Sequence, residues 1–148
     1  MLCSDGASTR AVANALTKKF GPIRVILEEP ISRMQIAKRR LRKLGVLRTA
    51  GQIAFIVLVQ PLLHRQARGR IREVEASYGL ENKWPQAEIS RVNSVNSDAA
   101  HQILQSLNPE IVIVNGTRII SRETLECVDA VFVNTHAGIT PLYRGVHG

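Results

Sequence analysis

The sequence predicts an α/β fold: an open, mostly parallel sheet with helices on both faces. Short apolar segments rich in β-branched residues alternate with segments of helical periodicity, which is typical of β–α–β units. Residues 110–114, Glu-Ile-Val-Ile-Val, are apolar in all but the first position, as expected of a parallel strand buried on both faces. The 148 residues are enough for a hydrophobic core, and we expect one domain over residues 1–148.

The first predicted elements end at residue 27. Residues 1–3 are expected to be the end of a strand, and residues 4–7 are expected to form a turn. A helix is predicted from about residue 9 to residue 20, because apolar residues recur every four positions and would face the sheet: Val12, Leu16 and Phe20. Residues 23–27 are predicted to form a short buried strand.

The section at about residues 31–85 is too long for an ordinary crossover between strands, so we interpret it as a helical insertion. Helices are predicted there at residues 33–44, 49–59 and 62–78. Gly45 and Pro61 are expected to break the chain between these helices. A polar loop from about residue 79 to residue 86 ends the section.

Strands and helices alternate again after the insertion. The predicted strands lie at residues 87–92, 110–114 and 130–133. The predicted helices lie at residues 97–107, where Ser97 can act as the N-terminal cap, and at residues 121–126. A turn is expected at residues 115 and 116, and a loop is expected from Asn134 onward.

Positive charge is concentrated in the insertion. The formal net charge is +8. The basic residues form two clusters, Arg33, Lys38, Arg39, Arg40, Arg42, Lys43 and Arg48, and then Arg65, Arg68, Arg70 and Arg72. Two interpretations fit such clusters. They are solvated helix faces, or they attract an anionic partner such as a phosphorylated substrate, a polyglutamylated folate or RNA.

The remaining composition favours a cytoplasmic protein. The longest apolar stretch, Ile53–Val59, is far shorter than the roughly 20 residues of a membrane span, so no membrane contact is expected. The first residues lack the basic and apolar regions of a signal peptide. Cys3 and Cys127 make neither a disulfide framework nor a zinc pattern, and three of the four histidines lack partners at ligand spacing, so no metal is expected.

The candidate site is expected where the predicted strands end. In an open parallel sheet, ligands bind at the carboxyl ends of the strands. Three segments are expected there: residues 4–9, 115–120 and 134–148. The last segment is the most informative, because Asn134 and His136 lie two residues apart at a strand end and both side chains can reach one crevice.

This last segment resembles a known family. Residues 133–145, Val-Asn-Thr-His-Ala-Gly-Ile-Thr-Pro-Leu-Tyr-Arg-Gly, are similar to the Asn-x-His-x-Ser-Leu-Leu-Pro-x-(Tyr/Trp/Phe)-(Arg/Lys)-Gly pattern of 10-formyltetrahydrofolate-dependent formyltransferases. That family includes glycinamide ribonucleotide transformylase, methionyl-tRNA formyltransferase and nucleotide-sugar formyltransferases. Residues 109–121 resemble the family strand and loop that hold the pterin ring, and residues 4–9 resemble a glycine turn that grips a substrate phosphate. The resemblance covers most of the chain except about residues 31–85.

The resemblance implies a Rossmann-like enzyme that transfers a formyl group from 10-formyltetrahydrofolate to a primary amine. The amine attacks the formyl carbon, and an oxyanion develops on the formyl oxygen. Asn134 and a protonated His136 would donate hydrogen bonds to that oxyanion, and removing one such donor costs on the order of 100–1,000-fold in rate. His136 would also carry a proton to the leaving nitrogen.

The resemblance also assigns binding residues. Those expected against the folate, mainly through backbone groups, are Asn115, Gly116, Arg118, Ile119 and Ile120. Those expected to hold the acceptor phosphate, at a helix N-terminus, are Asp5, Gly6, Ala7, Ser8 and Thr9. The acceptor would be anionic and similar to glycinamide ribonucleotide, or else an amino-sugar nucleotide or methionyl-tRNA.

The sequence departs from the family pattern in its last segment. Gly138 stands where Ser is common, and residues 139–140 are Ile-Thr where Leu-Leu is common. We expect the backbone to follow the same course, with a changed contact to the acceptor or the folate. The family's catalytic Asp follows the His by some tens of residues, and the sequence ends at Gly148. We therefore expect a piece of a longer formyltransferase that by itself lacks one catalytic group. The alternative from another class is a non-catalytic folate- or nucleotide-binding module whose basic insertion docks RNA or a partner.

Overall fold

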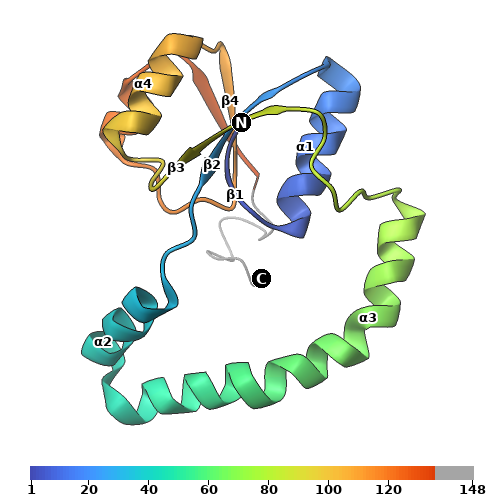
Figure 1. The fold of residues 1–148 in the computed structure, drawn as a ribbon, viewed down its shortest axis with the longest axis vertical. Helices are drawn as coiled ribbons and strands as arrows, with labels where there is room; N and C mark the ends of the chain where they lie inside the picture. The colour runs from blue at the N-terminus through green and yellow to red at the C-terminus, as the bar shows by residue number, and fades with distance from the viewer. Residues whose placement is uncertain (136–148) are drawn as a thin grey trace. The chain divides into compact units, whose positions relative to one another are not determined.

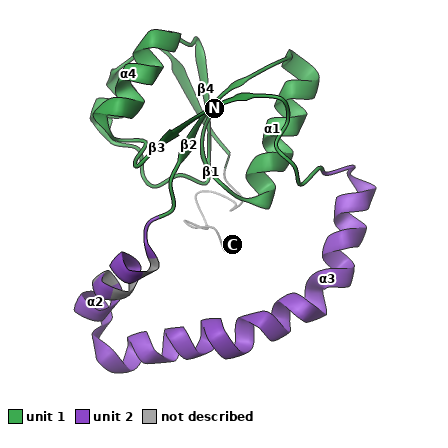
Figure 2. Cartoon of the chain, viewed as in Figure 1, with its two compact units in different colours: residues 1–30, 81–148 green, residues 31–80 purple. Residues whose placement is uncertain are grey.

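The computed structural model describes residues 1–135, without the side chains of residues 33, 37 and 39. The chain forms two compact units, coloured differently in Figure 2. The first unit joins Met1–Pro30 with the residues from Glu81 onward, and the second is Ile31–Leu80. The second unit corresponds to most of the expected insertion, and the first carries the sheet and those predicted site residues that the structure describes.

The first unit is built on five parallel strands in the order β3-β2-β1-β4-β5. The strands are β1 (Leu2–Ser4), β2 (Arg24–Glu28), β3 (Glu88–Val92), β4 (Ile111–Asn115) and β5 (Val131–Asn134). Every strand predicted from the sequence is present, within one or two residues of its expected bounds, and the parallel α/β class is confirmed. The strand order reverses between β1 and β4, which is where open parallel sheets form their ligand crevice.

Helices cover both faces of this sheet. They are α1 (Ala7–Phe20), α4 (Asp98–Leu107) and the short α5 (Arg122–Glu126). Figure 1 shows α1 and α4 on opposite sides of the strands. One core cluster joins the strands to α4 and consists of Leu2, Ile26, Val92, Val95, Ala100, Leu104, Val112 and Val114. A second, smaller cluster consists of Cys3, Val25 and Leu27, with Trp84 packed against it. Neighbouring strand residues point to opposite faces of the sheet, so alternate positions supply the two clusters.

Helix α1 is present as predicted, but the residues expected to face the sheet are not its most buried ones. Val12 and Leu16 are only half-buried, and Phe20 is exposed. The buried residues of the helix are Thr9 and Ala13, which lie one position further round on the helix. These two side chains are small, so the helix can approach the strands closely along that line, and the larger apolar residues are displaced to its margin. The polar Thr9 consequently lies in the interior.

The second unit is a long helical segment that contains α2 (Arg33–Ala54), the π-helical turn η1 (Phe55–Val59) and α3 (Gln60–Ser77). Helix α2 begins at Ser32, whose Oγ accepts a hydrogen bond of 3.2 Å from the backbone amide of Gln35. The predicted break at Gly45 is confirmed, because this residue interrupts α2 with a φ of 75°. Glycine adopts this left-handed conformation without the steric cost of a side chain.

The predicted break at Pro61 is wrong. Pro61 lies in the first turn of α3, and the residues before it, Val59 and Gln60, have helical backbone angles. Proline has no N–H group for a hydrogen bond to the preceding turn, and a π-helical turn alters the hydrogen-bond ladder at such a place. The position of η1 in the turn before Pro61 therefore explains why the helix continues through the proline.

Candidate functional site

The carboxyl edge of the sheet collects polar residues. Four of the strands end on a polar residue: Ser4 on β1, Glu28 on β2, Asn115 on β4 and Asn134 on β5. Because all five strands are parallel, these residues lie along the same edge. The three segments predicted to form the site all begin at this edge, as expected.

The side chain of Asn115 joins the three predicted segments. It is buried at the end of β4, beside the point where the strand order reverses. The hydroxyl of Thr9, in the first turn of α1, donates a hydrogen bond of 2.9 Å to Asn115 Oδ1. Asn115 Nδ2 in turn donates a hydrogen bond of 2.6 Å to Thr135 Oγ1. One buried amide therefore connects the loop after β1, the loop after β4 and the residue that follows β5.

Gly116 sets the direction of the chain after β4. Its φ of 67° lies in the left-handed region, and a Cβ added there would meet Thr9 Oγ1 at 3.8 Å, which is an ordinary contact. The need for glycine is therefore conformational, and a residue with a side chain would cost roughly 1–2 kcal/mol at this position. The turn leads into residues 117–121, the loop expected to lie against a folate.

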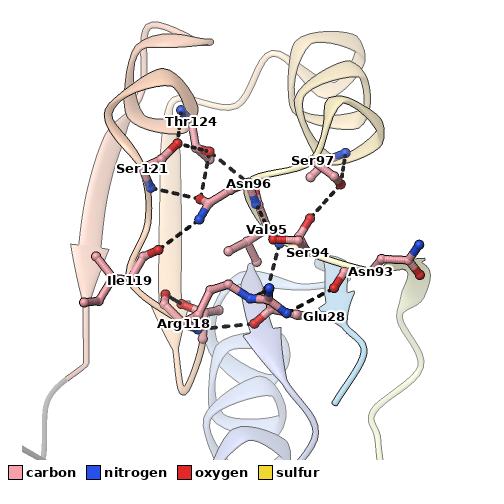
Figure 3. Close-up of polar contacts among 12 residues, drawn as sticks. Glu28, Asn93, Ser94, Val95, Asn96, Ser97, Arg118, Ile119, Ser121 and Thr124 are labelled. Carbon is pink, nitrogen blue, oxygen red and sulfur yellow. Dashed lines mark hydrogen bonds and ion pairs between the residues drawn. The ribbon is translucent and has the colours of Figure 1, made fainter. Parts of the chain in front are cut away.

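A buried carboxylate, Glu28, anchors this loop (Figure 3). It is only 4% exposed. Its Oε1 accepts a hydrogen bond of 2.9 Å from the backbone amide of Val95, and its Oε2 accepts one of 3.2 Å from the backbone amide of Arg118. These bonds connect the end of β2 to the segments that follow β3 and β4.

The side chain of Arg118 completes this anchor. Its Nε lies 2.5 Å from Glu28 Oε1, and its Nη2 donates a hydrogen bond of 3.1 Å to the carbonyl oxygen of Asn93. The Nε–H does not point along a hydrogen bond to the carboxylate, so this contact is an ion pair only. The guanidinium is therefore engaged within the protein, and Arg118 positions the loop.

Asn96 holds the far end of the loop. Its Nδ2 donates a hydrogen bond of 3.0 Å to the carbonyl oxygen of Ile119, and its Oδ1 accepts one of 2.9 Å from the backbone amide of Ser121 (Figure 3). Ile119 exposes 92% of its surface, whereas Ile120 packs against the core under α4. The loop is thus fixed at both ends, with one apolar side chain projecting from it.

The Ser121 end of the loop also leads into α5. Ser121 is the cap of this helix and accepts a hydrogen bond of 3.3 Å from the backbone amide of Thr124. Hydrogen bonds from Ser121 and from its own backbone amide lower the pKa of the Glu123 carboxyl. A carboxylate that stays ionised in the first turn complements the positive end of the helix dipole.

The loop after β1 leads into helix amides that have no side-chain cap, and it carries a balanced pair of charges. Gly6 is the N-terminal cap of α1 and provides no side-chain hydrogen bond to the first amides of the helix. The Asp5 carboxylate lies 2.5 Å from Arg10 Nη1, and Arg10 Nε donates a hydrogen bond of 3.1 Å to Asn82 Oδ1. The amides of Ala7 to Thr9 are at the positive end of the helix dipole, with a cation beside them.

The predicted catalytic pair falls at the boundary of the described residues. Asn134 is exposed at the end of β5, opposite Val114 of β4. Successive residues of an extended chain point to opposite sides. Because Thr135 points to Asn115, the Asn134 side chain is directed away from that buried amide. His136 lies outside the described residues together with the rest of 136–148, so its role stays a prediction.

Comparison of the chain with protein-family models, with curated proteins and with solved structures found no match. The character of the site therefore rests on its own residues and their geometry.

Metal and thiol chemistry have little support at this edge. Within residues 1–135, no group of three His, Cys, Asp or Glu residues is placed to hold a metal ion. His101 instead contacts Thr124, with 2.8 Å between Nε2 and Oγ1, and so links α4 to α5. Burial raises the pKa of the Cys3 thiol to about 11 and also raises that of Cys127. Both cysteines are therefore neutral thiols at neutral pH and poor nucleophiles.

An apolar groove of about 610 Å³ lies at the opposite, amino edge of the sheet. Its lining includes Met1, Leu16, Phe20, Ile23, Leu107 and Ile111. These residues belong to the amino ends of β1, β2 and β4 and to the ends of α1 and α4. Parallel sheets carry their chemistry at the carboxyl edge, so this groove is not the candidate site.

Sequence reasoning missed three residues that organise the site: Glu28, Asn96 and Thr135. The signal for Glu28 was visible, since a carboxylate ends an apolar strand that is otherwise buried. Charged residues in such places are paired in native proteins. Asn96 and Thr135 lie in polar stretches, and nothing in the sequence distinguishes them from their neighbours.

Proposed function

We propose that the chain is a formyltransferase domain with a Rossmann-like fold, which transfers a formyl group from 10-formyltetrahydrofolate to a primary amine of a phosphorylated acceptor. The strand order β3-β2-β1-β4-β5 supports the fold assignment. It matches the first five strands of the doubly wound order in which ligands bind at the reversal between the first and fourth strands.

The Asn115 bridge is the observation that carries the proposal. The resemblance assigns residues 4–9 to the acceptor, residues 115–120 to the folate and residues 134–148 to the formyl group. These segments are far apart in the sequence, yet Thr9, Asn115 and Thr135 form one hydrogen-bonded chain at the reversal. A reaction between two substrates needs these three functions side by side.

In the proposed reaction, the amine nitrogen forms a bond to the formyl carbon while the formyl oxygen becomes an oxyanion. The Asn134 amide and a protonated His136 donate hydrogen bonds to this oxygen. The bond between the formyl carbon and N10 then breaks. The proton lost by the amine reaches N10 by way of His136, so that tetrahydrofolate leaves as a neutral amine.

The loop at residues 116–121 suits a planar ring. Glu28 and Asn96 hold its backbone at both ends, so binding a ligand costs little additional ordering of the chain. The projecting side chain of Ile119 offers an apolar contact to one face of a pterin. The polar edge of the pterin would form hydrogen bonds with backbone groups. The identities of the side chains in this loop therefore do not identify the ligand.

The acceptor is proposed to bind at the start of α1. Its phosphate would lie at the amides of Ala7, Ser8 and Thr9, where the helix dipole is positive. Arg10 would share its guanidinium between Asp5 and the phosphate. Glycinamide ribonucleotide, an amino-sugar nucleotide and methionyl-tRNA all combine a phosphate with a primary amine, so all three are candidates.

A spectrophotometric assay of tetrahydrofolate release tests the proposal. The protein is incubated with 10-formyltetrahydrofolate and each of the three acceptors. Release is expected with one of them, and His136→Ala should abolish it, while Asn134→Ala should lower the rate on the order of 100–1,000-fold. Lys18→Ala, on the exposed face of α1, is the control and should leave the rate unchanged. Undiminished release by His136→Ala would remove that residue from the mechanism.

A non-catalytic folate- or nucleotide-binding module is the second candidate. The observation that favours it is the pairing of charge at the described part of the site. Glu28 is paired with Arg118, and Asp5 is paired with Arg10, so each of these ionised side chains is already engaged. Saturable binding of 10-formyltetrahydrofolate without release of tetrahydrofolate, with any of the acceptors, would identify the module.

A further inference from the structure

An apolar helical run lies on the surface of the second unit. Ile53–Val59 are seven consecutive apolar residues, and the five side chains of η1 are between 38% and 66% exposed. Neither η1 nor α3 buries any residue. Seven consecutive residues cover every side of a helix, so rotation about the helix axis cannot turn a polar face to water. A helix that is apolar all round requires an apolar environment.

The charges around this run have one sign. Between Glu29 and Glu73 the sequence contains eleven Lys and Arg residues and no Asp or Glu. The rest of the chain has nine Lys and Arg residues against twelve Asp and Glu residues, and is therefore net negative. Between Lys43 and His64 the one charged residue is Arg48. Basic clusters thus lie on both sides of the apolar run, which fits a partner with an anionic surface and an apolar interior.

The connections of the second unit argue against a crossing of the membrane. By length and composition, the helical segment Arg40–Ser77 is long and apolar enough to cross a membrane. Its unit, however, is joined at one end to β2 and at the other end to β3, and these two strands are paired neighbours in one sheet. Both ends of the unit are therefore on the same side of any membrane. A single crossing would separate them, and a return crossing would carry the basic residues 65–72 through hydrocarbon.

The distribution of basic residues also argues against a crossing of the membrane. A helix that spans a membrane has its Lys and Arg residues enriched on the cytoplasmic side. Here the apolar run has a basic cluster before it and another after it. Long basic side chains at both ends can reach the headgroups of a single membrane surface while the middle of the helix contacts the acyl chains.

We propose that residues 44–63 bind in the plane of a lipid bilayer with anionic headgroups. Ile53–Val59 lie in the outer part of one leaflet, and the flanking Lys and Arg residues contact headgroup phosphates. RNA would pair with the basic clusters but leave the apolar run in water, and a second copy of the chain would cover the run but bring like charges together. The expectation of no membrane contact considered the length of the apolar run alone, without its exposure or its flanking charges. This inference is independent of formyl transfer.

Flotation of the full chain with vesicles tests the proposal. Vesicles of equal parts phosphatidylglycerol and phosphatidylcholine should carry the protein. Vesicles of phosphatidylcholine alone should carry at least about tenfold less, because each Lys or Arg near an anionic surface contributes roughly a fivefold gain in binding. Val57→Asp should abolish flotation. Val131→Asp is the matched control, because the two valines are 61% and 63% exposed and Val131 lies on β5 of the first unit.

A second pair of variants tests the charges. Arg65→Gln combined with Arg68→Gln should weaken binding to the anionic vesicles by about tenfold or more. Lys18→Gln combined with Lys19→Gln, on α1 of the first unit, removes the same charge and should leave binding unchanged. Circular dichroism of each variant verifies that its helical content matches that of the parent chain.

Several results would overturn the proposal. They are absence of flotation by the parent chain, equal flotation on both kinds of vesicle, and undiminished flotation of Val57→Asp. A dimer in solution that Val57→Asp dissociates, without vesicle binding, would assign the run to a second copy. The fluorescence of Val57→Trp reports how deep residue 57 lies in the bilayer. The parent chain, whose one tryptophan is Trp84, gives the background signal. Strongest quenching by lipids labelled near the headgroups is expected, and strongest quenching at the bilayer centre would contradict the in-plane position.

Discussion

The buried carboxylate of Glu28 is expected to be one of the largest single contributors to the stability of the first unit. The variant Glu28→Gln keeps the shape of the side chain and removes its charge. The backbone amides of Val95 and Arg118 donate to different oxygens of Glu28, and glutamine has an NH2 donor in place of one of them, so one amide loses its acceptor. The guanidinium of Arg118 also loses its ion pair. A hydrogen bond to a charged group contributes about 1.5–3 kcal/mol.

The ion pair adds less than a fully buried pair would, because Arg118 is 34% exposed and can be partly rehydrated. We therefore expect Glu28→Gln to lower the free energy of unfolding by about 2–4 kcal/mol. Urea unfolding followed by the fluorescence of Trp84, which packs against the smaller core cluster, measures this change in the first unit.

The matched control is Glu88→Gln. Glu88 pairs with Arg24 on the surface, where the two side chains are exposed by more than half, so its loss should cost less than about 1 kcal/mol. If both variants lower the free energy of unfolding by the same amount, Glu28 does not anchor the loops in the way described.

Three further predictions concern residues near the reversal of the strand order. Thr9→Val and Asn115→Ala should each destabilise the protein by about 1–3 kcal/mol. A double-mutant cycle should give a coupling free energy of at least about 0.5 kcal/mol between the two residues. Additive effects of the two substitutions would contradict the hydrogen bond between them. Gly116→Ala should cost roughly 1–2 kcal/mol in urea unfolding because of the positive φ, and a neutral result would contradict that backbone conformation. The raised pKa of Cys3 means that the folded state retains the thiol proton longer than the unfolded state does. The contribution of the protonated Cys3 thiol to the free energy of unfolding is complete below about pH 9 and is lost as the pH rises to about 11. This loss amounts to roughly 2–3 kcal/mol, and Cys3→Ala should flatten the pH dependence of the free energy of unfolding between those values.

The strands and short helices could be predicted because their residues are locally consistent. Apolar runs rich in β-branched residues gave β2, β4 and β5, and Ser97 and Ser121 gave the starts of α4 and α5. The prediction that the site lies at the carboxyl edge of the sheet followed from the parallel α/β class alone. No local rule indicates which side chains would meet at that edge, so the bridge from Thr9 through Asn115 to Thr135 became visible only with the sheet assembled.

The failures of prediction have physical causes. The most buried residues of α1 are Thr9 and Ala13 and not those of the apolar stripe, because close packing favours their small side chains. Pro61 was expected to break the helix, but the π-helical turn before it changes the local hydrogen bonding. The exposure of the apolar run at Ile53–Val59 depends on what surrounds it, and the sequence carries that information only indirectly, through the flanking charges.

Direct observation of the transferred group tests the central claim, that this edge of the sheet supports formyl transfer. The protein is given 10-formyltetrahydrofolate labelled with ¹³C in the formyl group, together with the acceptor amines, and the product is followed by NMR. We expect the label to move to the nitrogen of one acceptor, and to stay on the folate with His136→Ala. A label that stays on the folate, or is released as formate, with the unaltered protein and every acceptor would contradict it.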